Sequence, residues 1–218
     1  MNPKRISYVF GQRFFGDGLL LDHLIFVALV LFILTSCDNP FGTRDAEPPE
    51  NQSPTNWKQP TQPSDVLDNL RNAIQDENIT NYLNSLTNTP TNGRNFGFRP
   101  DQIAIIRFPG VWDNWNIEME RTYLSNIFQA IPSDSLPSLI FIGQGTETPL
   151  ADSTIIIHDY ELYLPHARSG EQFPRLARGR VEFRLARNPE GFWAIFNWID
   201  IGVEGSPSWS EIKAAFVQ

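Results

Sequence analysis

Cysteine and histidine are scarce in this 218-residue chain, and their scarcity limits its chemistry. The single cysteine, Cys37, allows no intrachain disulfide. The three histidines, at positions 23, 158 and 166, show no spacing typical of a metal site, so we expect no metal. The sequence has no Gly-x-Ser-x-Gly nucleophile motif. Its Gly143-Gln144-Gly145 segment is too short for a phosphate-binding loop, so no cofactor is predicted.

Basic residues are also few after position 36, where 14 lysines and arginines stand against 23 aspartates and glutamates. So acidic a chain repels a phosphate backbone, which argues against a nucleic-acid partner. Six arginines do gather between positions 168 and 187, and they could contact an anionic lipid or a polyanion. We favour the alternative that outward-facing arginines pair with acidic residues of the neighbouring strand: Arg178, Arg180 and Arg184 with Asp159 and Glu161.

Long hydrophobic runs are missing as well. The longest apolar run, Leu24–Leu34, has 11 residues and follows the basic residues Lys4, Arg5 and Arg13. A helix over this run would span about 16 Å at 1.5 Å per residue, whereas a bilayer's hydrocarbon core is roughly 30 Å thick. The run therefore has the length of the apolar region of a signal peptide.

The run ends in Leu34-Thr35-Ser36-Cys37, which resembles a bacterial lipobox. The resemblance implies that residues 1–36 are a lipoprotein signal peptide and that Cys37 carries acyl chains such as palmitate. Two or three acyl chains would anchor the protein stably, because each buried methylene contributes about 0.8 kcal/mol. We therefore expect a lipid-anchored, extracytoplasmic protein of the bacterial cell envelope, either periplasmic or surface-exposed. Its anchor could lie in the inner or the outer membrane. The alternative is an uncleaved signal anchor with a free thiol.

Residues 37–63 are predicted to be the lipidated cysteine and a disordered tether. The segment Asp38–Pro63 contains six prolines and almost no aliphatic side chains. Such a segment buries too little apolar surface to repay the entropy of ordering.

Residues 64–218 are predicted to form one α+β domain. Apolar residues repeat with helical spacing in two early segments, one starting at Ser64 and one at Asn78, and again in a longer stretch around Asp113–Ile131. Residues 87–100 are punctuated by proline and glycine and indicate a loop. From residue 136 the period changes to two, which predicts strands over Ser138–Ile142, Thr154–Leu164, Arg178–Arg187 and Phe192–Ile201. Ser208-Trp209-Ser210-Glu211 is a capping box for a last short helix.

This order of elements resembles the nuclear transport factor 2-like superfamily, which includes ketosteroid isomerase-like and polyketide cyclase-like proteins. The similarity runs from about Ser64 to the C-terminus. It is carried by Gly179-Arg180-Val181-Glu182-Phe183, by Gly191-Phe192-Trp193 with Trp198-Ile199-Asp200, and by Ser208-Trp209. It implies a cone-like, curled antiparallel sheet with the N-terminal helices on its concave face. Because this superfamily holds both enzymes and non-catalytic binding domains, the resemblance does not fix an activity.

The strand phase identifies the side chains that face the interior of the cone. If the apolar side chains of each strand face the same way, the residues that point inward are Val181, Phe183, Leu185, Ile156 and Leu162. His158 and Tyr160 share that face, so together with Asp200 they could perform acid–base chemistry. We favour the simpler interpretation that they are hydrogen-bonded core residues.

Four aromatic residues, Trp115, Tyr123, Phe183 and Trp198, are candidates to line a ligand pocket, although core packing is the default for such side chains.

Three alternative functions are compatible with this sequence. The first is a non-catalytic domain that binds an apolar small molecule in the cone, or an envelope protein or second copy on the open sheet face. The second is an isomerase, dehydratase or hydrolase acting through the acid–base set. The third is a structural accessory subunit with a filled pocket.

Overall fold

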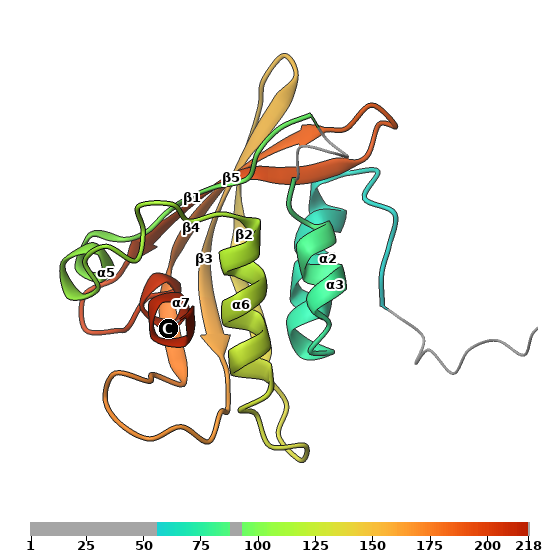
Figure 1. Cartoon of the computed structure of the whole chain (residues 1–218). Coiled ribbons are helices and arrows are strands. Elements are labelled where there is room, and N and C mark those ends of the chain that lie inside the picture. The colour runs from blue at the N-terminus through green and yellow to red at the C-terminus, as the bar shows by residue number, and fades with distance from the viewer. Residues whose placement is uncertain (1–55, 88–92, 218) are drawn as a thin grey trace, which may run out of the picture. The chain divides into compact units, whose positions relative to one another are not determined.

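The computed structural model describes residues 56–87 and 93–217, and these lie in one compact unit spanning Pro54–Gln218 (Figure 1). Cys37, the predicted signal peptide 1–36 and the predicted tether up to residue 55 lie outside the described residues. Within the described ranges, no helix is both long and apolar enough to pass through a bilayer.

Helices and long strands follow one another largely as the sequence predicts. The helices are α2 (Pro63–Gln75), α3 (Ile79–Asn84), α5 (Gln102–Arg107), α6 (Ile117–Phe128) and α7 (Trp209–Val217). The strands are β1 (Gly97–Arg99), β2 (Ser138–Pro149), β3 (Ser153–Tyr163), β4 (Leu176–Arg187) and β5 (Trp193–Gly202).

The five strands form one sheet in the order β1-β5-β4-β3-β2. Strands β2 to β5 are antiparallel neighbours, whereas β1 runs parallel to β5 with Phe98 opposite Trp198. The α+β class is confirmed, but the sheet is mixed rather than purely antiparallel. The predicted loop over residues 87–100 contains β1, and three residues are too few to show a period of two.

Helices α2, α3, α6 and α7 lie on the same side of the long strands (Figure 1). The residues predicted to point inward from β3 and β4, namely Ile156, Leu162, Val181, Phe183 and Leu185, are all buried in the core beneath these helices. The predicted strand phase is therefore confirmed.

Helix boundaries differ from the prediction where polar side chains cap the backbone. The expected stretch around Asp113–Ile131 is helical only from Ile117, because the side chain of Asn116 accepts the backbone N–H of Glu118 at 2.9 Å. Helix α5 was not predicted; Asp101 caps it by accepting the N–H of Ile103 at 2.7 Å.

The first helix also starts earlier than predicted. The sequence predicts a helix that starts at Ser64, but α2 begins at Pro63, and the carboxylate of Asp65 accepts the N–H of Gln62 at 3.0 Å. Proline suits the first helical position because its missing N–H would have no partner there.

Residues 56–62, which the sequence assigned to the tether, are hydrogen-bonded to the domain. The backbone of Lys58 exchanges two hydrogen bonds with the side chain of Asn69, at 2.9 and 2.7 Å. Pro60 accepts the backbone N–H of Trp193 at 2.8 Å. This segment therefore packs with α2 and the start of β5.

Strand β2 continues past its predicted end at Ile142. Its pairing with β3 is interrupted between Ile142 and Thr146 and then resumes to Pro149. Gly143 and Gly145 both have positive φ in this bulge, at 74° and 66°. The two glycines broke the alternation that the sequence-based prediction relied on.

Candidate functional site

A lysine lies at the centre of the domain. Helix α7 directs Trp209, Lys213 and Phe216 to one side, because residues at i, i+4 and i+7 share a helical face. All three are fully buried, and the side chain of Lys213 has 0% of its surface exposed. A buried ammonium is costly unless a charged partner meets it.

The partner of Lys213 is Glu120 of α6, whose side chain is also 0% exposed, and the two form an ion pair. The carboxylate of Glu120 accepts two further hydrogen bonds, from the Tyr82 hydroxyl at 3.0 Å and from the Trp115 indole at 2.7 Å. Each of its oxygens is therefore hydrogen-bonded, which is the condition for keeping a buried charge.

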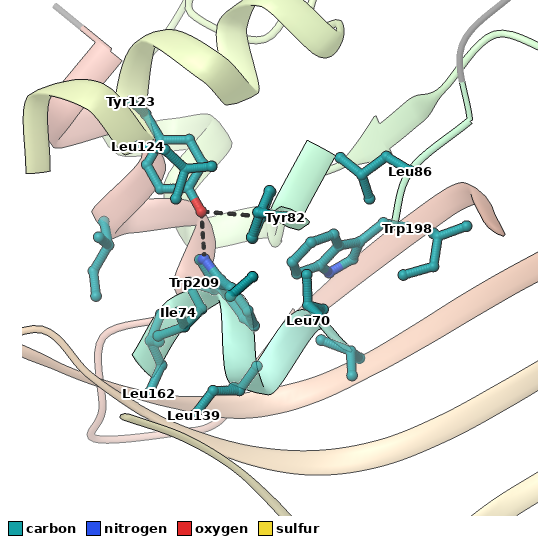
Figure 2. Packing of buried hydrophobic residues seen from close by; sticks show 14 of the residues in the cluster. Leu70, Ile74, Tyr82, Leu86, Tyr123, Leu124, Leu139, Leu162, Trp198 and Trp209 are labelled. Carbon is teal, nitrogen blue, oxygen red and sulfur yellow. Dashed lines mark hydrogen bonds between the residues drawn. The ribbon is translucent and has the colours of Figure 1, made fainter. Parts of the chain in front are cut away.

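A chain of hydrogen bonds leads from α7 to this carboxylate. The Trp209 indole donates to the Tyr123 hydroxyl at 3.2 Å, and Tyr123 donates to the Tyr82 hydroxyl at 3.1 Å (Figure 2). Tyr82 then donates to Glu120. Burial, followed by the charge of Glu120, raises the pKa of both tyrosines well above the usual range, so both stay protonated as donors.

Aromatic rings surround the ammonium of Lys213. The centroids of Trp198 and Phe98 lie 3.9 and 4.1 Å from Nζ. Those of Tyr123, Trp115 and Trp209 lie 5.2, 5.7 and 5.9 Å away. Burial lowers the pKa of Lys213 to about 8, and the charge of Glu120 limits this fall.

A second buried cluster joins β3, β5 and the start of α7. Asp200 accepts the Tyr160 hydroxyl at 2.9 Å through one oxygen, and the backbone N–H and hydroxyl of Ser210 through the other, at 2.7 and 2.5 Å. Burial raises the pKa of Asp200 to about 6, although the hydrogen bonds from Ser210 oppose the rise. The Tyr160 hydroxyl accepts the N–H of Trp209 at 2.7 Å. Asp200 and Tyr160 thus hold the first turn of α7.

The structure brings together two of the three acid–base candidates. Tyr160 and Asp200 are hydrogen-bonded to each other, but His158 makes no hydrogen bond with either. The His158 ring instead lies 5.4 Å from the Phe141 ring, centroid to centroid, and its Nδ1 is buried without a hydrogen-bond partner among the described residues. The three side chains therefore do not converge on one reacting position.

The four pocket candidates form two ring pairs, and three of them, Trp115, Tyr123 and Trp198, also face the ammonium of Lys213. Trp115 and Tyr123 lie 6.4 Å apart, and Phe183 and Trp198 4.9 Å apart, between ring centroids. Four surface grooves formed by residues within 56–87 and 93–217 have linings that contain none of these aromatics. Side chains thus occupy the part of the domain where a ligand pocket was expected (Figure 2).

One surface groove, of 450 Å³, does reach two buried carboxylates, Asp101 and Asp200. Both are already engaged, since Asp101 accepts the Ser208 hydroxyl and the N–H of Ile103, and Asp200 accepts Tyr160 and Ser210. Their oxygens therefore accept hydrogen bonds from residues at the starts of α5 and α7 and are not free to bind a ligand in the groove. No group of three or more potential metal-ligating side chains is found among the described residues.

The outer face of the sheet, opposite the helices, carries paired charges. Arg178 pairs with Glu161 at 2.7 Å and Arg180 with Asp159 at 2.7 Å, both across strands as predicted. Arg184 departs from the prediction by pairing within β4, with Glu182 at 2.9 Å. Isoleucines lie among these pairs with large exposed fractions: Ile140 at 50%, Ile142 at 50% and Ile201 at 44%.

Comparison with known proteins finds chains of similar structure at low sequence identity. No family model matches the chain, and no curated protein matches its sequence. An NTF2-like superfamily protein from Salmonella enterica shares 11% identity with a TM-score of 0.47, covering 63% of this chain and 85% of that one. An NTF2-like protein from Cytophaga hutchinsonii shares 11% identity with a TM-score of 0.45, covering 64% and 94%.

A third likeness is to a protein of unknown function with a cystatin-like fold from Nostoc punctiforme, at 9% identity and a TM-score of 0.44, covering 66% and 90%. Two of these three structures are named as NTF2-like proteins, and the NTF2-like superfamily is the one that this sequence resembles. At such identities and TM-scores they assign no activity, so the domain is interpreted from its own side chains.

Sequence reasoning missed the central pair, Lys213 and Glu120. A signal was present, because Lys213 occupies the face of α7 that Trp209 and Phe216 define, and Glu120 lies one helical turn before Tyr123. A charged residue at an apolar position of a helix predicts a buried partner of opposite sign. Which acid serves Lys213 depends on the tertiary fold.

Proposed function

We propose that this protein is a lipid-anchored, extracytoplasmic member of the bacterial cell envelope, with an NTF2-like domain that binds protein partners and performs no catalysis. The observation that carries the proposal is the filled interior, where Lys213 and Glu120 form a buried ion pair enclosed by aromatic rings. A domain whose interior is occupied by its own side chains must meet partners through its surface.

The same observation argues against the enzyme and small-molecule alternatives. A general acid or base must reach a substrate atom within hydrogen-bond distance. Tyr160 and Asp200 are hydrogen-bonded to each other and to the backbone at the start of α7, and His158 is hydrogen-bonded to neither of them. An apolar ligand needs a concave site lined by aromatic side chains, and the candidate aromatics contact each other instead.

The outer face of the sheet is the surface that we assign to partner binding, with a second copy of the chain as partner. Its three arginines and three acids are balanced in charge, so the face suits neither a polyanion nor an anionic membrane. A two-fold interface requires a patch that is complementary to itself, and a face carrying both signs between exposed isoleucines fits this requirement.

The anchor is tested by changing Cys37. Membrane fractions of cells that produce wild-type protein or the Cys37→Ala variant are compared, with and without globomycin. Lipidation predicts that the wild type partitions into detergent and that the variant and the treated cells accumulate a larger, unprocessed form. A wild-type chain of full mass with a free thiol would overturn the anchor and leave the domain's binding role standing.

The partner surface is tested by analytical ultracentrifugation of the Pro54–Gln218 unit, which contains the core. We expect the wild type to dimerise and Ile142→Glu to be monomeric, because the new charge lies on this face directly opposite Asp159 of β3. Ile106→Glu, at a 73% exposed position on α5, is the matched control and should dimerise as the wild type does. A monomeric wild type at high concentration would contradict self-association through the sheet.

A further inference from the structure

The surroundings of Lys213 have the composition of a binding site for an organic cation. Five aromatic rings have centroids within 6 Å of its Nζ, and one carboxylate, Glu120, completes the shell. Ring faces carry a partial negative charge, so a cation at this distance is attracted to each of them. The attraction is strongest where water is excluded, and the side chains of Lys213 and Glu120 are both fully buried.

Most of this shell is built without α7, the helix that carries Lys213. Phe98 comes from β1, Trp198 from β5, Tyr123 and Glu120 from α6, and Trp115 from the turn before α6. Among the shell residues, Trp209 alone belongs to α7. The remainder of the domain thus forms a receptor, and Lys213 enters it as a side chain from another element.

Glu120 is oriented independently of Lys213. The Tyr82 hydroxyl and the Trp115 indole both donate to its carboxylate, so its position is fixed by α3 and by the turn before α6. Among the described residues, Lys213 Nζ has Glu120 as its one hydrogen-bond acceptor; the ring faces of Trp198 and Phe98 lie beside it, and the charge of Asp200 also favours its protonated form. A carboxylate held in place beneath aromatic walls selects a single positive charge.

From this arrangement we propose that the interior of the domain is a binding site for a primary alkylammonium group, which the chain fills with its own Lys213. The inference uses neither the lipid anchor nor the sheet interface, and it goes beyond the proposed function. The ligand class follows from the shell: Glu120 repels anions, the ring faces attract a cation, and the side chain of Lys213 itself shows that an alkyl chain fits beside the charge.

The experiment removes the built-in ligand and supplies it again from solution. Lys213→Ala deletes three methylenes and the ammonium, which is the size of n-propylammonium. Thermal unfolding of the purified full-length protein in a non-ionic detergent is followed by tryptophan fluorescence while n-propylammonium chloride is titrated. 1-Propanol, which has the same shape without the charge, is the matched ligand.

A ligand that binds the folded state raises the unfolding temperature with its concentration. We expect n-propylammonium to raise the Tm of Lys213→Ala, with an apparent affinity about tenfold or more above that of 1-propanol. The wild type, whose site is filled, and Lys213→Met, whose side chain fills the same space, should show no such difference. Adding Glu120→Gln to Lys213→Ala should abolish the preference for the cation.

If Lys213→Ala does not fold alone, the readout becomes its refolding from urea, measured by near-ultraviolet circular dichroism. Recovery with n-propylammonium but not with 1-propanol or sodium chloride supports the proposal. Failure to refold with any of them overturns it, as does an equal response of Lys213→Ala to the alcohol and the ammonium.

Discussion

The hydroxyl of Tyr160 donates a hydrogen bond of 2.9 Å to Asp200 and accepts one of 2.7 Å from the backbone N–H of Trp209. One oxygen atom thereby links β3, β5 and the first residue of α7. All three residues are buried, so water cannot replace either hydrogen bond. A pair that sequence alone offered as acid–base candidates instead holds the helix that carries Lys213.

Tyr160→Phe should destabilise the domain without changing its fold. The substitution leaves the N–H of Trp209 and an oxygen of Asp200 without a partner, and each unsatisfied buried group costs about 1–3 kcal/mol. We expect a loss of about 2–4 kcal/mol in the free energy of unfolding, measured by urea denaturation. Tyr163→Phe on the same strand, where the side chain is exposed, is the control and should change stability by less than about 0.5 kcal/mol.

Asp200 should make stability depend on pH in the acidic range. In the unfolded chain an aspartate loses its proton near pH 4. In the folded protein burial raises the pKa of Asp200 to about 6. Between these values the folded state binds more protons than the unfolded state, so this group makes stability fall as pH rises from 4 to 6.

Urea denaturation of wild type and Asp200→Asn at pH 4 and pH 7 isolates this effect, because other titrations cancel in the difference. The free energy of unfolding of the wild type, minus that of the variant, should be about 2–3 kcal/mol larger at pH 4 than at pH 7. A difference independent of pH would show that Asp200 is ionised in the folded protein across the whole range.

The regular elements could be predicted because their signals are local. Val181, Phe183 and Leu185 alternate along one strand, and Ser208 and Glu211 exchange the two hydrogen bonds of the predicted capping box, at 2.9 and 3.2 Å. Strand β1 escaped prediction because its stability comes from pairing with β5, far along the sequence. Helix α5 escaped because six residues give too short a pattern.

The site was harder to predict than the fold because it depends on which residues meet. Strand phase correctly placed Tyr160 inward, and the structure adds that its hydroxyl is saturated by Asp200 and Trp209. The meeting of Lys213 with Glu120 joins positions 93 residues apart. No local sequence pattern predicts which residues make such a contact, although a lysine on an apolar helical face indicates that a buried acidic partner exists.

The buried ion pair should show strong coupling in a double-mutant cycle. Lys213→Met leaves the carboxylate of Glu120 uncompensated, and Glu120→Gln leaves the ammonium uncompensated, so each single substitution should cost about 3–5 kcal/mol. The double variant should be less destabilised than the sum, because no buried charge remains. Urea denaturation of the four proteins gives the coupling energy; additive costs would mean that the two charges do not compensate each other.

The two glycines of the β2 bulge should differ in their tolerance of alanine. Both have positive φ, so alanine at either position strains the backbone by about 1–2 kcal/mol. A Cβ at Gly145 would lie 2.4 Å from the His158 ring, whereas a Cβ at Gly143 meets nothing within 4 Å. Gly145→Ala should therefore cost about 1–3 kcal/mol more than Gly143→Ala in urea denaturation. In a His158→Ala background the two alanine substitutions should cost the same, and a persistent difference there would exclude the imidazole as the cause.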